Sequence, residues 1–287
     1  MLAVPWTLAA DETLITPGAE LELVSDTFQF TEGPATDAKG NVFFTDQPNN
    51  RILKWDARTG AIAEWMKPAG RSNGMDFDAA GNLIACADEE NELWSIAPDQ
   101  TVTVLADDFR GRLLNGPNDC WVDPFGGIYF TDPLYKRPWW DRDPESQLDG
   151  RHVYYLSADR DTLVLVATGF EQPNGIVGSP DGSALYVADI GAGITYRFDV
   201  LGAGRLSEPA AHCEMGSDGM TLDERGNLYL TGDGVTVFDP GGTKILHIDV
   251  PEGWTANVTF GGSERRTLFI TAGDSVYTLD MAVRGAP

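Results

Sequence analysis

The sequence is poor in cysteine, histidine and basic residues. Its three cysteines, Cys86, Cys120 and Cys213, are irregularly spaced and form no Cys-x-x-Cys pair, so we expect buried thiols rather than a disulfide framework or a zinc site. No apolar run is long enough for a membrane-spanning helix. Only 20 lysines and arginines stand against 44 aspartates and glutamates, which gives a net charge of −24. Phosphate backbones and anionic membranes repel such a chain, so neither nucleic acid nor a membrane is an expected partner.

What remains is the composition of a soluble globular protein, with 42% apolar and 22% charged residues. A chain of 287 residues can form one large domain or two ordinary ones. The first residues are apolar but lack the basic segment of a signal peptide. Two interpretations of residues 1–12 stay open, a trimmed signal peptide or a flexible N-terminus. A periplasmic, secreted or cytoplasmic location stays open as well.

The 32 glycines and 17 prolines are dispersed, which predicts many short strands joined by tight turns. Six units share one form: a polar residue usually followed by glycine, a short apolar strand, an Asp-x-x-Gly-Asn turn, and a second strand ending near Thr-Asp. Their first residues are 41, 45, 56, 44 and 39 positions apart, which is the period of a propeller blade. A second pair of strands follows in each unit, as at 51–55 and 61–65. We therefore predict an all-β fold over residues 1–287, a single six-bladed β-propeller of four-stranded antiparallel blades.

The two ends of the chain are expected to meet in the last blade. The sixth unit runs out of chain after its third strand, at 275–279. Residues 21–24 precede the first unit without belonging to a unit of their own. We predict that this N-terminal strand completes the last blade as its outer strand, which closes the ring non-covalently.

The repeat also predicts a ring of oxygen ligands. The innermost strand of each blade runs along the central channel, so residues at one phase of the repeat gather at one end of it. The six residues at the first phase are two acids and four amides: Glu32, Asn73, Asn118, Asn174, Asp218 and Asn257. Oxygen ligands with two negative charges suit a hard cation, Ca²⁺ before Mg²⁺. An alternative is that Asn and Asp before Gly simply form turns, where their side chains satisfy backbone groups.

Other hydrolytic chemistry finds little support. His152, His212 and His247 share no phase of the repeat, and no Gly-x-Ser-x-Gly motif is present. A Ser-His-Asp hydrolase is therefore not indicated, and a metal would have to act as the electrophile.

The longest interval between units contains an aromatic insertion, residues 133–144. Long loops on a rigid scaffold commonly carry binding function, and aromatic rings over a polar channel suit stacking against a sugar. Tyr135 and Trp139 are therefore candidate substrate contacts. The alternative is that Trp139 and Trp140 pack the loop onto a blade.

Four motifs carry a resemblance to a known family: Leu-Asn-Gly-Pro-Asn-Asp at 114–119, Phe-Thr-Asp-Pro at 130–133, Gln-Pro-Asn-Gly-Ile at 172–176 and Ser-Asp-Gly-Met at 217–220. The chain resembles the family of senescence marker protein (regucalcin), gluconolactonase and luciferin-regenerating enzyme, in its bacterial gluconolactonase branch, and more distantly squid diisopropylfluorophosphatase. The resemblance implies a propeller with one catalytic divalent ion, held here by Glu32, Asn118, Asn174 and Asp218. Ca²⁺ is the expected ion, with Mg²⁺, Mn²⁺ or Zn²⁺ as substitutes. Animal members have arginine two residues before Asn118, where this chain has Gly116.

The expected function is that of a Ca²⁺-dependent lactonase, a hydrolase acting on carboxylic ester bonds that opens a sugar lactone such as glucono-1,5-lactone to the aldonic acid. Asp218 is the candidate general base, or else a metal ligand alone. The predicted substrate contacts are Asn73, Asn115, Tyr135, Trp139 and Asn257. Two alternatives stay open: hydrolysis of phosphotriesters or aryl esters at the same site, and a non-catalytic, Ca²⁺-stabilised binding module. The expected partner is a small lactone, and the chain is expected to be a monomer or a weak homo-oligomer.

Overall fold

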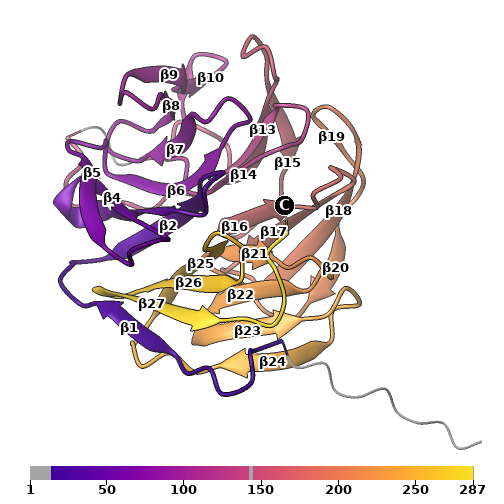
Figure 1. Cartoon of the computed structure of the whole chain (residues 1–287). Helices are drawn as coiled ribbons and strands as arrows, with labels where there is room; N and C mark the ends of the chain where they lie inside the picture. Colours follow the sequence, from indigo (N-terminus) through magenta and orange to yellow (C-terminus); the bar gives the residue numbers. More distant parts are fainter. Residues whose placement is uncertain (1–13, 142–144, 287) are drawn as a thin grey trace, which may run out of the picture.

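A computed structural model describes residues 14–141 and 145–286. The predicted flexible N-terminus, residues 1–12, lies outside them. The described chain is all-β apart from one short 3₁₀ helix, η1 (Gln47–Asn49). Figure 1 shows its sheets arranged around a central axis as the six antiparallel blades of a β-propeller. The predicted fold is confirmed.

The blades follow one another along the chain, each starting with the strand that lines the channel. Blade 1 contains β2 (Thr31–Thr36), β3 (Val42–Asp46), β4 (Arg51–Trp55) and β5 (Ile62–Met66). Blade 2 contains β6 (Ser72–Phe77), β7 (Leu83–Ala87), β8 (Glu92–Ile96) and β9 (Val102–Ala106). A hairpin of β10 (Asp108–Phe109) and β11 (Arg112–Leu113) leads to blade 3, which contains β12 (Cys120–Val122), β13 (Ile128–Asp132), β14 (His152–Leu156) and β15 (Leu163–Ala167).

Blades 4 to 6 continue the pattern. Blade 4 contains β16 (Pro173–Gly178), β17 (Ala184–Asp189), β18 (Ile194–Gly202) and β20 (Ala210–Cys213), and the short β19 (Arg205–Leu206) pairs with the end of β18. Blade 5 contains β21 (Met220–Leu222), β22 (Leu228–Gly232), β23 (Gly234–Phe238) and β24 (Lys244–Ile248). Blade 6 contains β25 (Thr255–Gly261), β26 (Thr267–Ala272) and β27 (Ser275–Asp280), with the N-terminal β1 (Glu22–Ser25) as its outer strand.

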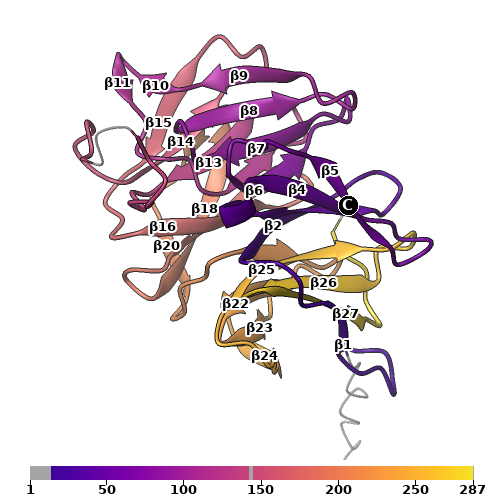
Figure 2. The same ribbon diagram turned by 90° about the vertical axis from the view of Figure 1, so that its left-hand side faces the viewer.

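The N-terminal strand closes the ring as predicted. β1 pairs antiparallel with β27, with Glu22 opposite Thr278 and Leu23 opposite Tyr277. Both views show β1 beside β27 at the edge of the last blade (Figures 1 and 2). The segment before β1 contributes as well, because Leu14 is buried in the core of blades 5 and 6. The first and last strands of the described chain therefore share one sheet.

The Asp-x-x-Gly-Asn motif is a turn between the first two strands of a blade. In blade 1, Oδ1 of Asp37 accepts hydrogen bonds from the backbone N–H groups of Lys39 (2.8 Å) and Asn41 (2.9 Å). Gly40 between them has φ of +83°, a conformation that favours glycine. The same aspartate bonds recur at Asp78, Asp123 and Asp223. The most visible repeat in the sequence is thus turn chemistry, and it fixes the lengths of the strands that line the channel.

The hydrophobic core lies between neighbouring blades. The second strand of each blade is buried along its length, apart from Thr267 at the start of β26. The aromatic side chains of Phe44, Trp55 and Phe269 meet between blades 1 and 6, with centroid distances of 5.5 Å from Phe44 to Phe269 and 5.6 Å from Trp55 to Phe269. The three cysteines are buried and free, as expected. Among the described residues, no helix has the length and apolarity that a membrane crossing requires. Densely packed strands on every side make the channel a rigid frame for any site within it.

Candidate metal centre

The six polar residues at the first phase of the repeat all lie at the start of a channel strand. Four are within strands β2, β6, β16 and β25, and the other two lie two residues before the first residues of β12 and β21. Each of those four strands has an irregularity of register against its neighbour at this level, between Glu32 and Ala35 in blade 1, for example. Such a bulge re-aims a side chain out of the regular alternation of a strand. The set is Glu32, Asn73, Asn118, Asn174, Asp218 and Asn257.

The glycine that follows most of these residues serves close packing between blades. A Cβ on Gly33 would lie 1.8 Å from the backbone oxygen of Asn73 in the next blade. The corresponding contacts are 2.2 Å from Gly74 to Oδ1 of Asp119, 2.8 Å from Gly175 to the backbone oxygen of Asp218, and 1.9 Å from Gly219 to the side chain of Asn257. Of these four glycines only Gly33 has a positive φ, +48°. The residue-glycine pairs are therefore not turn formers, and the glycines let the six channel strands approach one another.

Aspartates at the ends of the second strands hold the chain just ahead of the ring. Oδ2 and Oδ1 of Asp132 accept hydrogen bonds from the backbone N–H groups of Asn115 (3.0 Å) and Gly116 (2.8 Å). In blade 4, Asp189 accepts from Gln172 at 2.7 Å in the same way. The aspartate that ends the second strand thus positions the residues that lead into Asn118 and Asn174.

Glu32 is a buried carboxylate with few partners. It is 2% exposed, and its Oε2 accepts hydrogen bonds from the backbone N–H of Gly33 (2.8 Å) and from Nδ2 of Asn257 (3.2 Å). Burial raises the pKa of Glu32 well above its ordinary value, and the negative charges of Asp218 and Asp119 raise that pKa further. A cation beside this carboxylate would favour its ionised form and so oppose the rise in pKa.

Asp218 is half-buried and held at both oxygens. Its Oδ1 accepts from Nδ2 of Asn174 (2.7 Å) and its Oδ2 from Nε1 of Trp254 (2.6 Å). Burial raises the pKa of Asp218, while these two hydrogen bonds act in the opposite direction. The carboxylate is therefore fixed in orientation near the opening of the site, where it can meet water.

The amides of the ring offer oxygens that lack partners. The side chains of Asn73 and Asn118 are each 4% exposed and form no hydrogen bond to another described residue. Asn174 donates from Nδ2 to the hydroxyl of Tyr135 (2.8 Å) and to Asp218, which leaves its Oδ1 without a donor in the described chain. Buried polar groups are normally hydrogen-bonded, so such a set marks a place for a ligand.

The donor set fits a hard divalent cation. Within the described ranges, no three His, Cys, Asp or Glu side chains come together as a metal site. Metal binding here would therefore depend on two carboxylates and on amide oxygens, the ligand type that Ca²⁺ accepts in loose geometry. The four predicted ligands supply these groups: Glu32, Asn118, Asn174 and Asp218.

The insertion between β13 and β14 borders the opening of this site. Tyr135 reaches the ring through its bond from Asn174, and burial together with the charge of Asp218 raises its pKa to about 12. Trp139 is half-buried with the guanidinium of Arg71 4.8 Å from its ring centroid, and Nε1 of Trp140 donates to the backbone oxygen of Asp88 (2.7 Å). The tryptophans thus pack the loop down, whereas Tyr135 points at the ring. Residues 142–144 of the insertion lie outside the described residues.

The amide of Asn115 is fully engaged in hydrogen bonds, unlike the amides of Asn73 and Asn118. It is 1% exposed, and its Nδ2 donates to the backbone oxygens of Asp132 (3.1 Å) and Gly150 (2.9 Å). Its Oδ1 accepts from the hydroxyl of Ser146 at 2.5 Å. These bonds fasten the insertion to blade 3. A Cβ on the next residue, Gly116, would lie 2.8 Å from Oδ1 of Asp88, so an arginine at 116 would need Asp88 to move.

Two residues at this opening, Trp254 and Arg137, were not predicted from the sequence. Trp254 is 40% exposed and bonds Asp218, and Arg137 lies close enough for its positive charge to lower the pKa of Asp218. Neither occupies a phase of the repeat, so the periodicity could not select them. The available signal for Trp254 was its position three residues before Asn257 in the chain.

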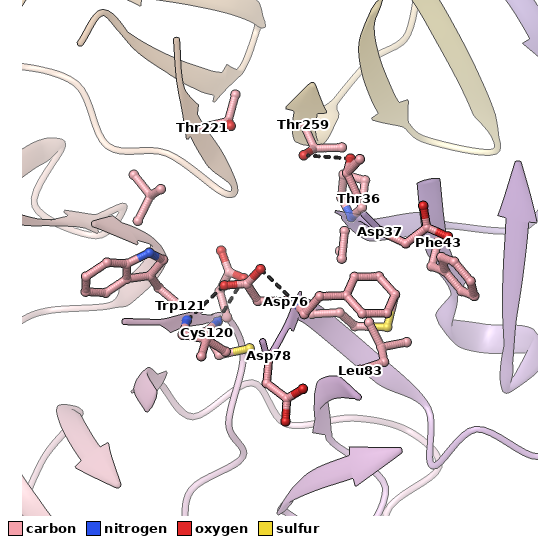
Figure 3. Close-up of a pocket in the computed structure, with 18 of the residues that line it drawn as sticks. Thr36, Asp37, Phe43, Asp76, Asp78, Leu83, Cys120, Trp121, Thr221 and Thr259 are labelled. Carbon is pink, nitrogen blue, oxygen red and sulfur yellow. Dashed lines mark hydrogen bonds between the residues drawn. The ribbon is translucent and has the colours of Figure 1, made fainter. Parts of the chain in front are cut away.

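The far end of the channel opens into a cavity of about 810 Å³ (Figure 3). Its lining includes the turn residues Asp37, Asp78 and Asp123, which mark this end as the one opposite the metal ligands. Asp76 lies in its wall and accepts hydrogen bonds from the backbone N–H groups of Val122 (2.8 Å) and Phe77 (2.8 Å). Burial raises the pKa of Asp76 to about 6. The four predicted ligands do not line this cavity.

Comparison with known proteins identifies the family. The family described as SMP-30/Gluconolactonase/LRE-like region matches residues 30–274. The chain belongs to this family. The gluconolactonase of Zymomonas mobilis is 26% identical over 294 residues, which cover 92% of this chain and 82% of that protein. The diisopropyl-fluorophosphatase of Loligo vulgaris is 28% identical, with 86% of this chain and 87% of that protein covered.

A solved structure supports the same assignment. The gluconolactonase XC5397 of Xanthomonas campestris superposes with a TM-score of 0.87 at 29% identity, covering 96% of this chain and 93% of that one. The predicted membership of the SMP-30/gluconolactonase family is confirmed. The expected enzyme class, a hydrolase acting on carboxylic ester bonds, agrees with the names of the two gluconolactonases.

Proposed function

We propose that this chain is a divalent-metal-dependent lactonase that opens a sugar lactone, such as glucono-1,5-lactone, to its aldonic acid. Glu32, Asn118, Asn174 and Asp218 would hold the ion, Ca²⁺ before Mg²⁺, Mn²⁺ or Zn²⁺. The observation that carries the proposal is the ring of buried oxygen donors, in which two carboxylates with raised pKa values accompany amides that lack hydrogen-bond partners. The names of the relatives supply the substrate class.

Hydrolysis of a lactone needs a positive charge that polarises the carbonyl and a base that takes a proton from water. A divalent cation bound in the ring supplies positive charge that polarises the lactone carbonyl. Asp218, oriented by Asn174 and Trp254, takes a proton from the attacking water as general base. The water oxygen bonds to the carbonyl carbon, the ring C–O bond breaks, and the proton returns to the ring oxygen, which leaves as a hydroxyl. Water is thereby added across one ester bond with no other reactant.

A pH-stat assay on glucono-1,5-lactone, with EDTA and with added Ca²⁺, tests the proposal. We expect turnover that is lost with the chelator and restored by Ca²⁺. Hydrolysis that is indifferent to EDTA would rule out the metal scheme. Asp218→Asn separates the two roles of Asp218, because a metal-loaded variant with wild-type turnover would leave it as a ligand and not a base.

A second candidate function is phosphotriester hydrolysis on the same site. It is favoured by the similarity to diisopropyl-fluorophosphatase, and a cation polarises P=O much as it does C=O. The same assay with diisopropyl fluorophosphate and with an aryl ester decides between them by the ratio of kcat/KM values. A non-catalytic binding module would instead lose thermal stability with the chelator while showing no activity on any of these substrates.

A further inference from the structure

The insertion brings the positive charge of Arg137 to the opening of the site. Arg137 lies between β13 and β14, and its side chain is 21% exposed. Its Nε bonds Oδ2 of Asp88 at 2.8 Å, and Asp88, directly after β7 in blade 2, is 5% exposed. The guanidinium also lies 5.1 Å from the ring centroid of Tyr135 and 5.7 Å from that of Trp139. A planar cation held by a carboxylate and two rings has little freedom, so its remaining donors have fixed directions.

The fixed guanidinium lies beside the ring of ligands. The guanidinium contacts the aromatic side chain of Tyr135. The hydroxyl of Tyr135 in turn accepts a hydrogen bond from Nδ2 of the predicted ligand Asn174 (2.8 Å). These two contacts place the guanidinium where a molecule bound beside Asn174 would meet it.

Most of the donors of Arg137 are unused. Nε donates a hydrogen bond to Asp88, whereas the two terminal nitrogens make no hydrogen bond to any residue that the structure describes. A guanidinium carries five N–H donors in a fork that suits paired oxygen acceptors. Because Asp88 already balances its charge, and the chain as a whole carries a net charge of −24, neutral oxygens suit this group better than an anion.

We propose that Arg137 is a specificity-determining residue, whose terminal N–H groups donate hydrogen bonds to the ring hydroxyls of a polyhydroxylated lactone held at the metal centre. The proposal rests on the proposed lactonase function. The insertion then selects the substrate, and the candidate metal ligands in the channel act in bond cleavage. Asp88, Tyr135 and Trp139 then act as positioning residues for the guanidinium.

The test compares glucono-1,5-lactone with δ-valerolactone, which has the same ring without hydroxyls. For Arg137→Met we expect KM for glucono-1,5-lactone to rise roughly tenfold or more with kcat little changed, and kcat/KM for δ-valerolactone to stay at the wild-type value. Arg137→Lys, which keeps the charge but not the fork, should recover part of the loss. The matched control is Arg197→Met, because Arg197 pairs with the exposed Asp199 on blade 4, away from the ring. Arg197→Met should leave kcat/KM unchanged for both lactones.

An equal loss of kcat/KM on both lactones in Arg137→Met would overturn the proposal, since it would mean that Arg137 acts through Asp218 or the loop. A wild-type preference for 6-phosphoglucono-1,5-lactone that disappears in Arg137→Met would overturn it in favour of anion recognition. If Arg137→Met lacks a cooperative thermal transition, Arg137→Lys carries the comparison of the two lactones. A wild-type protein that hydrolyses neither lactone would contradict the proposed function itself, which keeps the two failures apart.

Discussion

The backbone oxygen of Asn73 lies 1.8 Å from the point that a Cβ on Gly33 would occupy. Gly33 follows Glu32 in blade 1 and Asn73 begins the channel segment of blade 2, so two members of the ring are brought together by the absence of a side chain between them. The same relationship recurs between Gly219 and Asn257, at 1.9 Å. The spacing of the candidate ligands is therefore set by the packing of the strands that carry them.

We expect Gly33→Ala to destabilise the protein by more than about 3 kcal/mol, because a methyl group would overlap backbone atoms and the positive φ is strained for alanine. Thermal unfolding monitored by circular dichroism measures the effect. Gly253→Ala is the matched control, since a Cβ there meets no atom within 4 Å. Equal melting temperatures for the two variants would contradict the close-packing account.

Glu32→Gln should abolish the stabilisation by Ca²⁺ without destabilising the metal-free protein. With EDTA present, the variant is expected to melt above the wild type, because it removes a buried charge whose pKa is raised by burial and by Asp218. With Ca²⁺ at roughly 100 times its dissociation constant, the wild type should gain about 2.7 kcal/mol and the variant nothing.

Glu264→Gln supplies the control for the loss of one negative charge, since the side chain of Glu264 is 69% exposed. It should keep the full response to Ca²⁺. A Glu32→Gln variant that is stabilised by Ca²⁺ as strongly as the wild type would exclude Glu32 as a ligand.

Periodicity predicted the fold and the ring because both follow from position within a repeat. The six first-phase residues, the turns at Asp37 and its equivalents, and the closing strand β1 all lie where the repeat placed them. Trp254 and Arg137 escaped prediction because loop conformation, not strand register, determines where they point. Asn115 was selected from a motif beside Asn118, yet its amide bonds the insertion. A motif identifies neighbours along the chain, and the direction of each side chain depends on packing that no repeat encodes.

Deletion of residues 14–26 should lower the melting temperature by on the order of 10 °C, since it removes both β1 and the buried Leu14, each of which contributes a few kcal/mol. Differential scanning calorimetry checks this. A deletion confined to residues 1–13 is the matched control, because it removes the same number of residues and keeps both β1 and Leu14. If deletion of residues 14–26 lowered the melting temperature no more than the control deletion, the pairing of β1 with β27 would not contribute to closure of the ring.

The stability of the protein should depend on pH through Asp76, which lines the cavity at the far end of the channel. Burial raises its pKa from 3.8 to about 6, so the folded state holds a proton that the unfolded chain releases between these values. Stability is therefore highest below pH ~4 for this group and falls as the pH rises through about 6, by on the order of 3 kcal/mol. Asparagine resembles the protonated carboxyl. Asp76→Asn should thus match the wild type near pH ~4 and exceed its free energy of unfolding at pH ~7.

Urea unfolding at a series of pH values measures the difference between Asp76→Asn and the wild type. Asp249→Asn is the control, because the side chain of Asp249 is fully exposed and its removal should give a curve parallel to that of the wild type. A parallel curve for Asp76→Asn would mean that Asp76 ionises as readily in the folded protein as in the unfolded chain. A rising difference would instead identify the carboxyl in the far cavity as a buried group that destabilises the propeller at neutral pH.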